Sequence, residues 1–109
     1  MKNIISLVLF IGLSLATVIT HAGSSAAGKI IEIHQNGEVP GRGLCIQMEP
    51  ALSTKGWACL YTNNALYKEI TALLLTAYAT GNRCSVSWNK LDTSEFANIA
   101  WLSCYSAGK

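Results

Sequence analysis

Four cysteines and two histidines are the residues of this 109-residue chain that could bind a metal or act as nucleophiles. The cysteines form no C-x-x-C pair, the spacing that many metal sites and thiol oxidoreductases use. Widely spaced cysteines in even number are typical of an oxidised framework in a short chain, so we expect disulfides and a secreted or periplasmic protein. We expect no metal and no cofactor, because only His34 lies beyond the apolar leader.

The sequence also lacks the patterns of common catalytic sites. It contains no Gly-x-Ser-x-Gly nucleophile motif and no glycine-rich phosphate loop. Its six carboxylates form no evident pair of acid and base. We therefore interpret the protein as non-enzymatic, and a small enzyme or an inhibitor is the least favoured interpretation.

Aromatic side chains supply the remaining chemistry, which is binding. The chain has three tryptophans and four tyrosines, and aromatic rings beside polar groups suit sugar stacking and protein interfaces. We expect Trp57 and Trp101 to fill the core. Trp88 is expected to form a partly exposed platform, since its neighbours in the sequence are polar: Ser85, Ser87, Asn89 and Lys90.

The elements that must position these residues follow an apolar leader. Lys2, the apolar run 4–19 and the small residue Ala22 have the pattern of a signal peptide over residues 1–22, with a cut after Ala26 as the alternative. The run is short for a membrane-spanning helix, and no basic cluster follows it. We expect a flexible tail over residues 23–28 and a single domain over residues 29–109.

The charge balance argues against two classes of partner. The chain has eight Lys plus Arg and six Asp plus Glu, and one of the basic residues, Lys2, belongs to the leader. No basic block is present, whereas nucleic acids and anionic membranes attract clustered Lys and Arg. We expect no nucleic acid partner and no membrane insertion.

Five stretches have the residue pattern of β-strands: 28–34, 44–48, 57–61, 83–88 and 97–104. In the second stretch Leu44, Ile46 and Met48 share one face, and Cys45 points the other way. In an antiparallel hairpin the start of one strand lies beside the end of the next. We therefore expect two disulfides, Cys45 with Cys59 and Cys84 with Cys104. Four cysteines allow three connectivities, and this one alone follows from the hairpins without a long-range assumption.

One helix is predicted between the third and fourth strands. Thr62, Asn63 or Asn64 can cap its start, and Gly81 follows its last residue, Thr80. Its core-facing stripe is expected to consist of Leu66, Ile70, Leu73, Leu74, Ala77 and Tyr78. The order β-β-β-α-β-β predicts a mainly β fold with one helix (α+β), specifically a five-stranded OB-fold barrel stapled by two disulfides. A generic α+β meander is the alternative.

Three segments of the chain carry a resemblance to a known family. They are residues 27–31 with His34 and Gly37, residues 45–46 with 58–59, and residues 74–81 running into the strand at Arg83. Through them the chain beyond the leader resembles the B (binding) subunits of AB5 toxins of the subtilase cytotoxin and typhoid toxin class. It also resembles a broader set of small exported bacterial proteins of this shape.

The resemblance implies a function. B subunits of this class are OB-fold barrels that form a ring of five around a helix-lined pore, bind a sialylated host glycan and carry a catalytic A subunit. The resemblance assigns sugar contacts to Trp88 and Glu49. Ser25, close to the family's pocket serine position, and Asn89, which follows Trp88, complete the candidate glycan-binding residues. It also assigns a pore-facing helix surface to Tyr67, Lys68, Thr71 and Leu75.

Ala27 stands where the family has a pocket serine, so the identity of the glycan does not follow from the resemblance. The alternative function is a stand-alone structural or protein-interaction domain without a sugar ligand. That alternative predicts a monomer or a dimer, whereas the toxin hypothesis predicts a larger ring and glycan binding.

Overall fold

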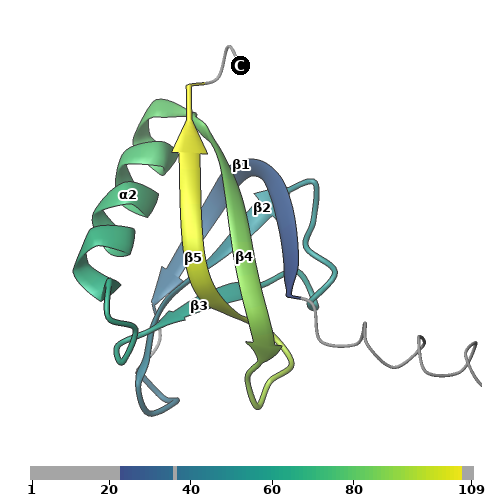
Figure 1. Ribbon diagram of the computed structural model, residues 1–109, viewed down its shortest axis with the longest axis vertical. Coiled ribbons are helices and arrows are strands. Elements are labelled where there is room, and N and C mark those ends of the chain that lie inside the picture. The colour runs from purple at the N-terminus through teal and green to yellow at the C-terminus, as the bar shows by residue number, and fades with distance from the viewer. Residues whose placement is uncertain (1–22, 36, 107–109) are drawn as a thin grey trace, which may run out of the picture.

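The computed structural model describes residues 23–35 and 37–106, and the predicted signal peptide over residues 1–22 lies outside this part of the chain. Five strands and one helix follow each other in the predicted order (Figure 1). They are β1 Ser24–Gln35, β2 Arg42–Glu49, β3 Ala58–Tyr61, α2 Tyr67–Thr80, β4 Arg83–Leu91 and β5 Ala97–Tyr105. The prediction of a mainly β fold with one helix is confirmed.

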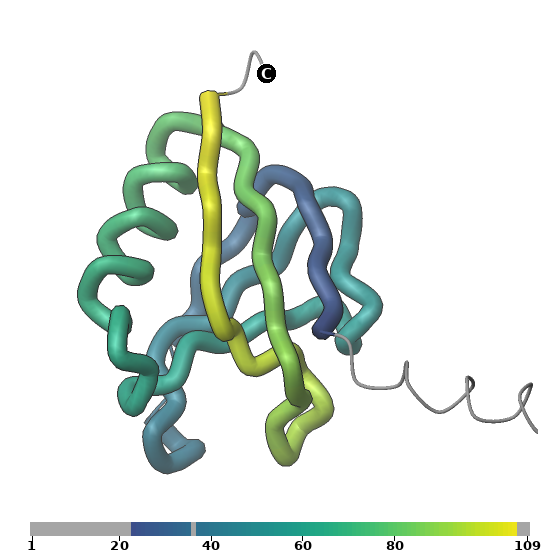
Figure 2. Tube along the Cα trace, in the orientation of Figure 1, coloured from purple at the N-terminus to yellow at the C-terminus, as the bar shows by residue number. Residues whose placement is uncertain are grey.

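The five strands form one sheet that closes in a ring. Its order is β1, β2, β3, β5 and β4, and β4 pairs with β1 again. All neighbours are antiparallel except β3 and β5, which are parallel. The tube in Figure 2 shows how β1 bends so that its two halves reach different neighbours. Ring closure therefore depends on β1.

β1 begins earlier than the sequence predicted. We expected a tail over residues 23–28, but the backbone from Ser24 to Gly28 pairs with β4. From Lys29 onward β1 pairs with β2. A Cβ atom at Gly28 would lie 2.5 Å from the Glu49 carbonyl oxygen, so only glycine fits where β1 changes partners.

The hydrophobic core fills the inside of the ring and the space under α2. Leu44, Ile46 and Met48 all belong to it, as their alternation along β2 predicts. The helix lies along one side of the sheet (Figure 1) and contacts β1, β3 and β5. The core thus holds both layers of the domain together.

The start of α2 is fixed by Asn64, although the helix proper begins at Tyr67. The Asn64 side-chain oxygen accepts a hydrogen bond from the Leu66 N–H at 2.8 Å, and its amide nitrogen donates to the Ile99 carbonyl at 3.1 Å. The helix ends as predicted: Gly81 has a left-handed φ of 77°, and its N–H bonds the Ala77 carbonyl at 2.9 Å.

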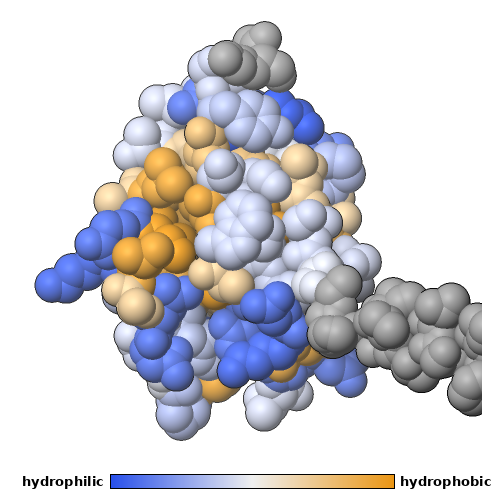
Figure 3. Space-filling model, viewed as in Figure 1, coloured by the Kyte–Doolittle hydropathy of each residue, from blue (hydrophilic) through white to orange (hydrophobic). Residues whose placement is uncertain are grey.

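Only part of the predicted apolar stripe of α2 is buried. Ile70, Leu74 and Ala77 are buried, whereas three other members of the stripe are exposed by 37 to 51%: Leu66, Leu73 and Tyr78. The prediction was wrong for these three because the contact between α2 and the sheet is narrower than the apolar stripe. In Figure 3 apolar side chains gather on the surface between α2 and β5.

Both predicted disulfides are present. Cys45–Cys59 joins β2 to β3, and Cys84–Cys104 joins β4 to β5. Each bond links residues that are direct partners in an antiparallel ladder, which is the arrangement that the hairpin argument predicts. Among the described residues, no helix is long and apolar enough to cross a membrane.

Candidate binding groove

The start of β1 and the end of β4 bring together three of the four predicted sugar contacts. Ser24 lies opposite Trp88, and Ser25 lies opposite Ser87 in the β1–β4 ladder. Asn89 follows Trp88 directly, and Ser25, Trp88 and Asn89 line one hollow on the surface. Residues far apart in the sequence thus share one site because the ring closes here.

Two irregularities in the β4–β5 ladder surround Trp88. Trp88 pairs with Ile99 while its neighbour Ser87 pairs with Trp101, so Ala100 is left without a partner. A second register shift follows directly after Trp88. β-Bulges re-aim side chains and are over-represented beside active sites. The strand is therefore deformed at the position where the hollow forms.

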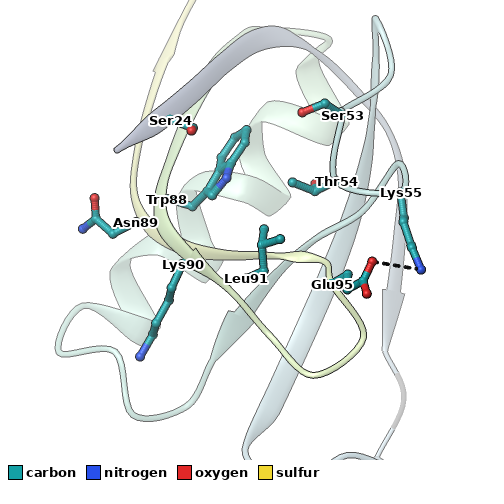
Figure 4. A pocket seen from close by; sticks show the side chains of 9 residues that line it. All are labelled: Ser24, Ser53, Thr54, Lys55, Trp88, Asn89, Lys90, Leu91 and Glu95. Carbon is teal, nitrogen blue, oxygen red and sulfur yellow. Dashed lines mark ion pairs between the residues drawn. The ribbon is translucent and has the colours of Figure 1, made fainter. Parts of the chain in front are cut away.

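The groove consists of two hollows that share Ser24, Trp88 and Asn89. The charged hollow, of about 490 Å³, extends to the loop between β2 and β3 (Figure 4); its other lining residues are Ser53, Thr54, Lys55, Lys90, Leu91 and Glu95. The neutral hollow, of about 310 Å³, adds Gly23, Ser25, Ser87 and Trp101. In Figure 4 the Trp88 indole lies among the labelled side chains, between Ser24 and Thr54.

The charged hollow carries a surplus of positive charge. Lys55 Nζ lies 3.2 Å from Glu95 Oε1, and these side chains are 61% and 65% exposed. Such an exposed ion pair contributes about 0 to 1 kcal/mol, so a ligand can rearrange it at little cost. Lys90 belongs to neither of the two ion pairs found among the described residues. With two lysines and one glutamate, the charged hollow therefore suits a ligand that carries an acidic group.

The exposures of two tryptophans are the reverse of the prediction. Trp88, predicted to be a partly exposed platform, is only 6% exposed and belongs to the core. Trp101, predicted to be in the core, is 52% exposed. The prediction was wrong for both residues, and Trp101 is the exposed aromatic side chain of the groove. Trp57, the other tryptophan expected in the core, is half-buried.

One of these errors had a signal in the sequence. Cys84, Val86 and Trp88 alternate along β4 and share one face, and all three lie in the core. Trp101 had no such signal, because the bulge at Ala100 reverses the alternation of β5. Sequence reasoning also missed the residues that the β2–β3 loop contributes: Ser53, Thr54 and Lys55.

Glu49 is the predicted sugar contact that the fold does not bring to the groove. It ends β2, where it pairs with Lys29 of β1, and it lines neither hollow. Its partner Lys29 is four residues from Ser25 along β1, a separation of about 13 Å at the rise of a β-strand. Glu49 therefore lies away from the groove.

The helix residues predicted to face a pore do not share one free surface. Lys68 and Leu75 are exposed. Tyr67 instead packs against the core, where a Cβ atom at Gly43 would lie 2.6 Å from the tyrosine oxygen. Thr71 is half-buried, and its hydroxyl has no hydrogen-bond partner in the structure. The free surface of α2 therefore includes only Lys68 and Leu75 of the predicted set.

A buried polar cluster lies at the loop between β4 and β5. Arg42 Nη2 and the Tyr61 hydroxyl each donate a 2.7 Å hydrogen bond to Asp92 Oδ2. The side chains of Arg42 and Asp92 are 8% and 5% exposed. Asp92 Oδ1 accepts the N–H groups of Ser94 at 2.8 Å and Phe96 at 3.0 Å. Asp92 thus ties this loop to β2 and β3.

These contacts shift three pKa values. Burial alone would raise the pKa of Asp92, but hydrogen bonds from Tyr61, the Phe96 N–H and Arg42 bring it below its usual value. Burial raises the pKa of Tyr61, and its bond to Asp92 raises it further. Burial alone would lower the pKa of Arg42, but its bonds to Tyr61 and Asp92 raise it. Each group therefore keeps its ordinary charge state near neutral pH, as in a structural ion pair.

Three rings cover the Cys45–Cys59 disulfide on the outer face of β2 and β3. The Trp57 ring centroid lies 5.8 Å from that of His34 and 6.2 Å from that of Phe96. Together with Arg42 and Cys45, these rings line a hollow of about 210 Å³. This layer explains why Cys45, although on the outward side of β2, is only 4% exposed. Within the described residues, no three His, Cys, Asp or Glu side chains are grouped to hold a metal ion.

Comparison with known proteins adds no assignment to this geometry. No family model matches the chain, and neither a curated protein nor a solved structure matches it.

Proposed function

We propose that this chain is a secreted, glycan-binding delivery subunit of an AB5-type toxin, which forms a pentameric ring and carries a catalytic A subunit. The observation that carries the proposal is the convergence of Ser25, Trp88 and Asn89 from two strands into one groove. In this proposal the ligand is a host cell-surface glycan, and its residues bind along the charged and neutral hollows.

The chemistry of the groove supports a sugar as the ligand. Carbohydrates offer an apolar ring face and many hydroxyl groups, and the groove offers an aromatic side chain, Trp101, beside small polar residues. The charged hollow adds Lys55 and Lys90, which suit an acidic sugar residue. The two hollows share Ser24, Trp88 and Asn89, so neighbouring residues of one glycan chain can occupy both.

The order of the strands supports an OB-type barrel as the fold. The helix stands between β3 and β4, and the sheet closes through a β1–β4 pairing and a parallel β3–β5 pairing. Barrels of this type bind oligosaccharides and oligonucleotides. The two disulfides favour an oxidising compartment, in agreement with secretion or a periplasmic location.

Exposed apolar side chains on α2 support the formation of a ring. Leu75 is 49% exposed on the side of the helix that faces away from the sheet, Tyr78 is exposed beside it, and Leu73 is exposed on the opposite flank of the helix. A helix with apolar residues on several sides is usually buried on several sides. A ring of copies, with the tail of an A subunit in its pore, would cover this surface.

A glycan array with the oxidised protein tests the proposal. We expect binding to at least one class of host glycan, and Asn89→Ala should weaken the signal. Trp88→Ala is unsuitable for this test, because removal of a buried tryptophan costs about 3 to 5 kcal/mol of stability. Gln35→Ala is the matched control, since Gln35 is a polar, exposed residue at the opposite end of β1. Absence of binding to every glycan would exclude the delivery function.

The second candidate is a stand-alone protein-interaction domain. The observation that favours it is the exposure of four large apolar side chains from one helix and its start: Leu66, Leu73, Leu75 and Tyr78. This candidate predicts no glycan binding and a monomer or dimer in light scattering.

A further inference from the structure

The neutral hollow contains a buried hydroxyl group that has no hydrogen-bond partner among the described residues. Ser87 is 6% exposed, lines the hollow, and its Oγ has no hydrogen-bond partner in the structure. Buried hydroxyl groups in folded proteins are nearly always paired. Ser87 is therefore the polar residue of this hollow that has the most to gain from a ligand.

An exposed indole stands directly beside this hydroxyl. Ser25, Ser87 and Trp101 are neighbours across β1, β4 and β5, because Ser25 pairs with Ser87 and Ser87 pairs with Trp101. Direct partners in a ladder place their side chains on the same face of a sheet. Trp101 is 52% exposed on that face. The row thus presents two small hydroxyl groups beside one large aromatic surface.

The side chains that line this hollow carry no charge. The seven lining residues are Gly23, Ser24, Ser25, Ser87, Trp88, Asn89 and Trp101. An ionised ligand group placed here would lose water without a charged side chain as its partner, which is costly. The lysines of the groove lie in the charged hollow instead. The neutral hollow therefore favours an uncharged ligand with both an apolar face and hydroxyl groups.

From these observations we propose that the neutral hollow is the subsite for a neutral pyranose, which stacks on Trp101 and bonds Ser87 Oγ through a ring hydroxyl. The inference rests on the proposed glycan-binding function and names the residues and the sugar class for one half of the groove. Ser87 Oγ is closed to water in the free protein, so the Trp101 indole turns to admit the sugar hydroxyl. Hydroxyls at the other edge of the pyranose face Ser25 and Asn89.

The first test uses simple sugars as probes. The oxidised protein, labelled with ¹⁵N, is titrated with methyl β-D-galactopyranoside, methyl α-D-mannopyranoside and N-acetylneuraminic acid. The chain has three tryptophans, so their indole N–H signals can be assigned by substitution. We expect at least one neutral pyranoside to shift the Trp101 indole and the Ser87 amide in a saturable way, without shifting the Trp57 indole.

Two variants separate the roles of the indole and the hydroxyl. Trp101→Ala should weaken the neutral pyranoside roughly tenfold or more. Ser87→Ala should weaken it roughly fivefold, and its unfolding midpoint should equal or exceed that of the wild type, since the substitution removes an unpaired buried hydroxyl. A merely structural role for Ser87 predicts no loss of affinity.

Tyr105→Ala is the matched control, because Tyr105 belongs to β5, faces the same side as Trp101 and lies outside the hollow. It should bind the pyranoside like the wild type.

If glycans bind the protein but Trp101→Ala and Ser87→Ala keep wild-type affinity, the inference fails and the proposed function stands. The same conclusion follows if only N-acetylneuraminic acid binds. If no glycan and no probe sugar binds, the inference and the proposed glycan-binding function both fail.

Discussion

Arg42 and Asp92 form an ion pair whose side chains the fold encloses almost completely. Their ion pair measures 2.7 Å, with side-chain exposures of 8% and 5%, and the Tyr61 hydroxyl bonds the same carboxylate oxygen. Burial of two charges is costly, so the pair is stable only while both partners and the extra hydrogen bonds are present. The loop beside the groove consequently depends on a single carboxylate.

We predict that Asp92→Asn destabilises the protein by about 3 kcal/mol or more, because Arg42 is left buried without a counter-charge. Urea unfolding at neutral pH measures the change. Glu95→Gln is the matched control, since it breaks the other ion pair of the described residues, whose partners are 61% and 65% exposed. The control should cost less than about 1 kcal/mol. Equal costs for the two variants would contradict this account.

The same carboxylate predicts a dependence of stability on pH. The folded-state pKa of Asp92 is lowered, so its contribution is fully present above the unfolded pKa of about 3.9 and is lost as pH falls through the folded pKa. The free energy of unfolding of the wild type should decrease below about pH 4. In Asp92→Asn this part of the decrease should be absent. Parallel pH profiles for the two proteins would assign the acid sensitivity to other carboxylates.

The sequence predicts the positions of the strands better than it predicts which side chains of a strand face the core. Alternation identified Leu44, Ile46 and Met48 as core, and hairpin geometry identified both disulfides. The face of Trp101 could not be predicted, because a bulge at Ala100 depends on how β5 pairs with β4. A single unpaired residue therefore determined that the Trp101 indole faces the groove and not the core.

The candidate site was predictable only in part for a related reason. Trp88 and Asn89 are adjacent in the sequence, and the resemblance to toxin subunits added Ser25. The contribution of Ser53, Thr54 and Lys55 depends on the loop between β2 and β3 lying beside the end of β4, a neighbourhood that exists only once the ring has closed. Local patterns carry no information about such a contact.

Each disulfide links one pair of neighbouring strands. We therefore expect the two disulfides to contribute similarly to the free energy of unfolding. The linked residues are separated by 14 and 20 positions, and the chain-entropy model gives about 3 kcal/mol for loops of this size. We expect Cys45→Ala/Cys59→Ala and Cys84→Ala/Cys104→Ala each to lower the free energy of unfolding by about that amount. Urea unfolding measures both. A pair whose removal costs nothing would show that its hairpin is already ordered in the unfolded chain.

At the scale of the whole molecule, α2 presents more apolar surface than the domain itself uses. Leu73, Leu75 and Tyr78 are exposed by 37%, 49% and 48%, and apolar side chains gather on the surface where α2 approaches β5 (Figure 3). Contiguous apolar surface on a small domain typically marks an interface. The groove lies mainly on β1 and β4, and Leu75 faces away from the sheet, so ligand binding and self-association through Leu75 use different surfaces.

Self-association through α2 gives the last prediction. Leu75→Glu places a charge on the helix surface that faces away from the sheet, and a charge buried between copies without a partner is strongly unfavourable. We expect light scattering to report an oligomer for the wild type and a monomer for Leu75→Glu. Leu91→Glu is the matched control, because Leu91 has the same 49% exposure but lies at the end of β4; it should keep the oligomeric mass. Because several linked sites bind a glycan surface more tightly than one, Leu75→Glu should also lose avidity for immobilised glycan while its affinity for a soluble sugar is unchanged. A monomeric wild type would instead support the stand-alone interaction domain.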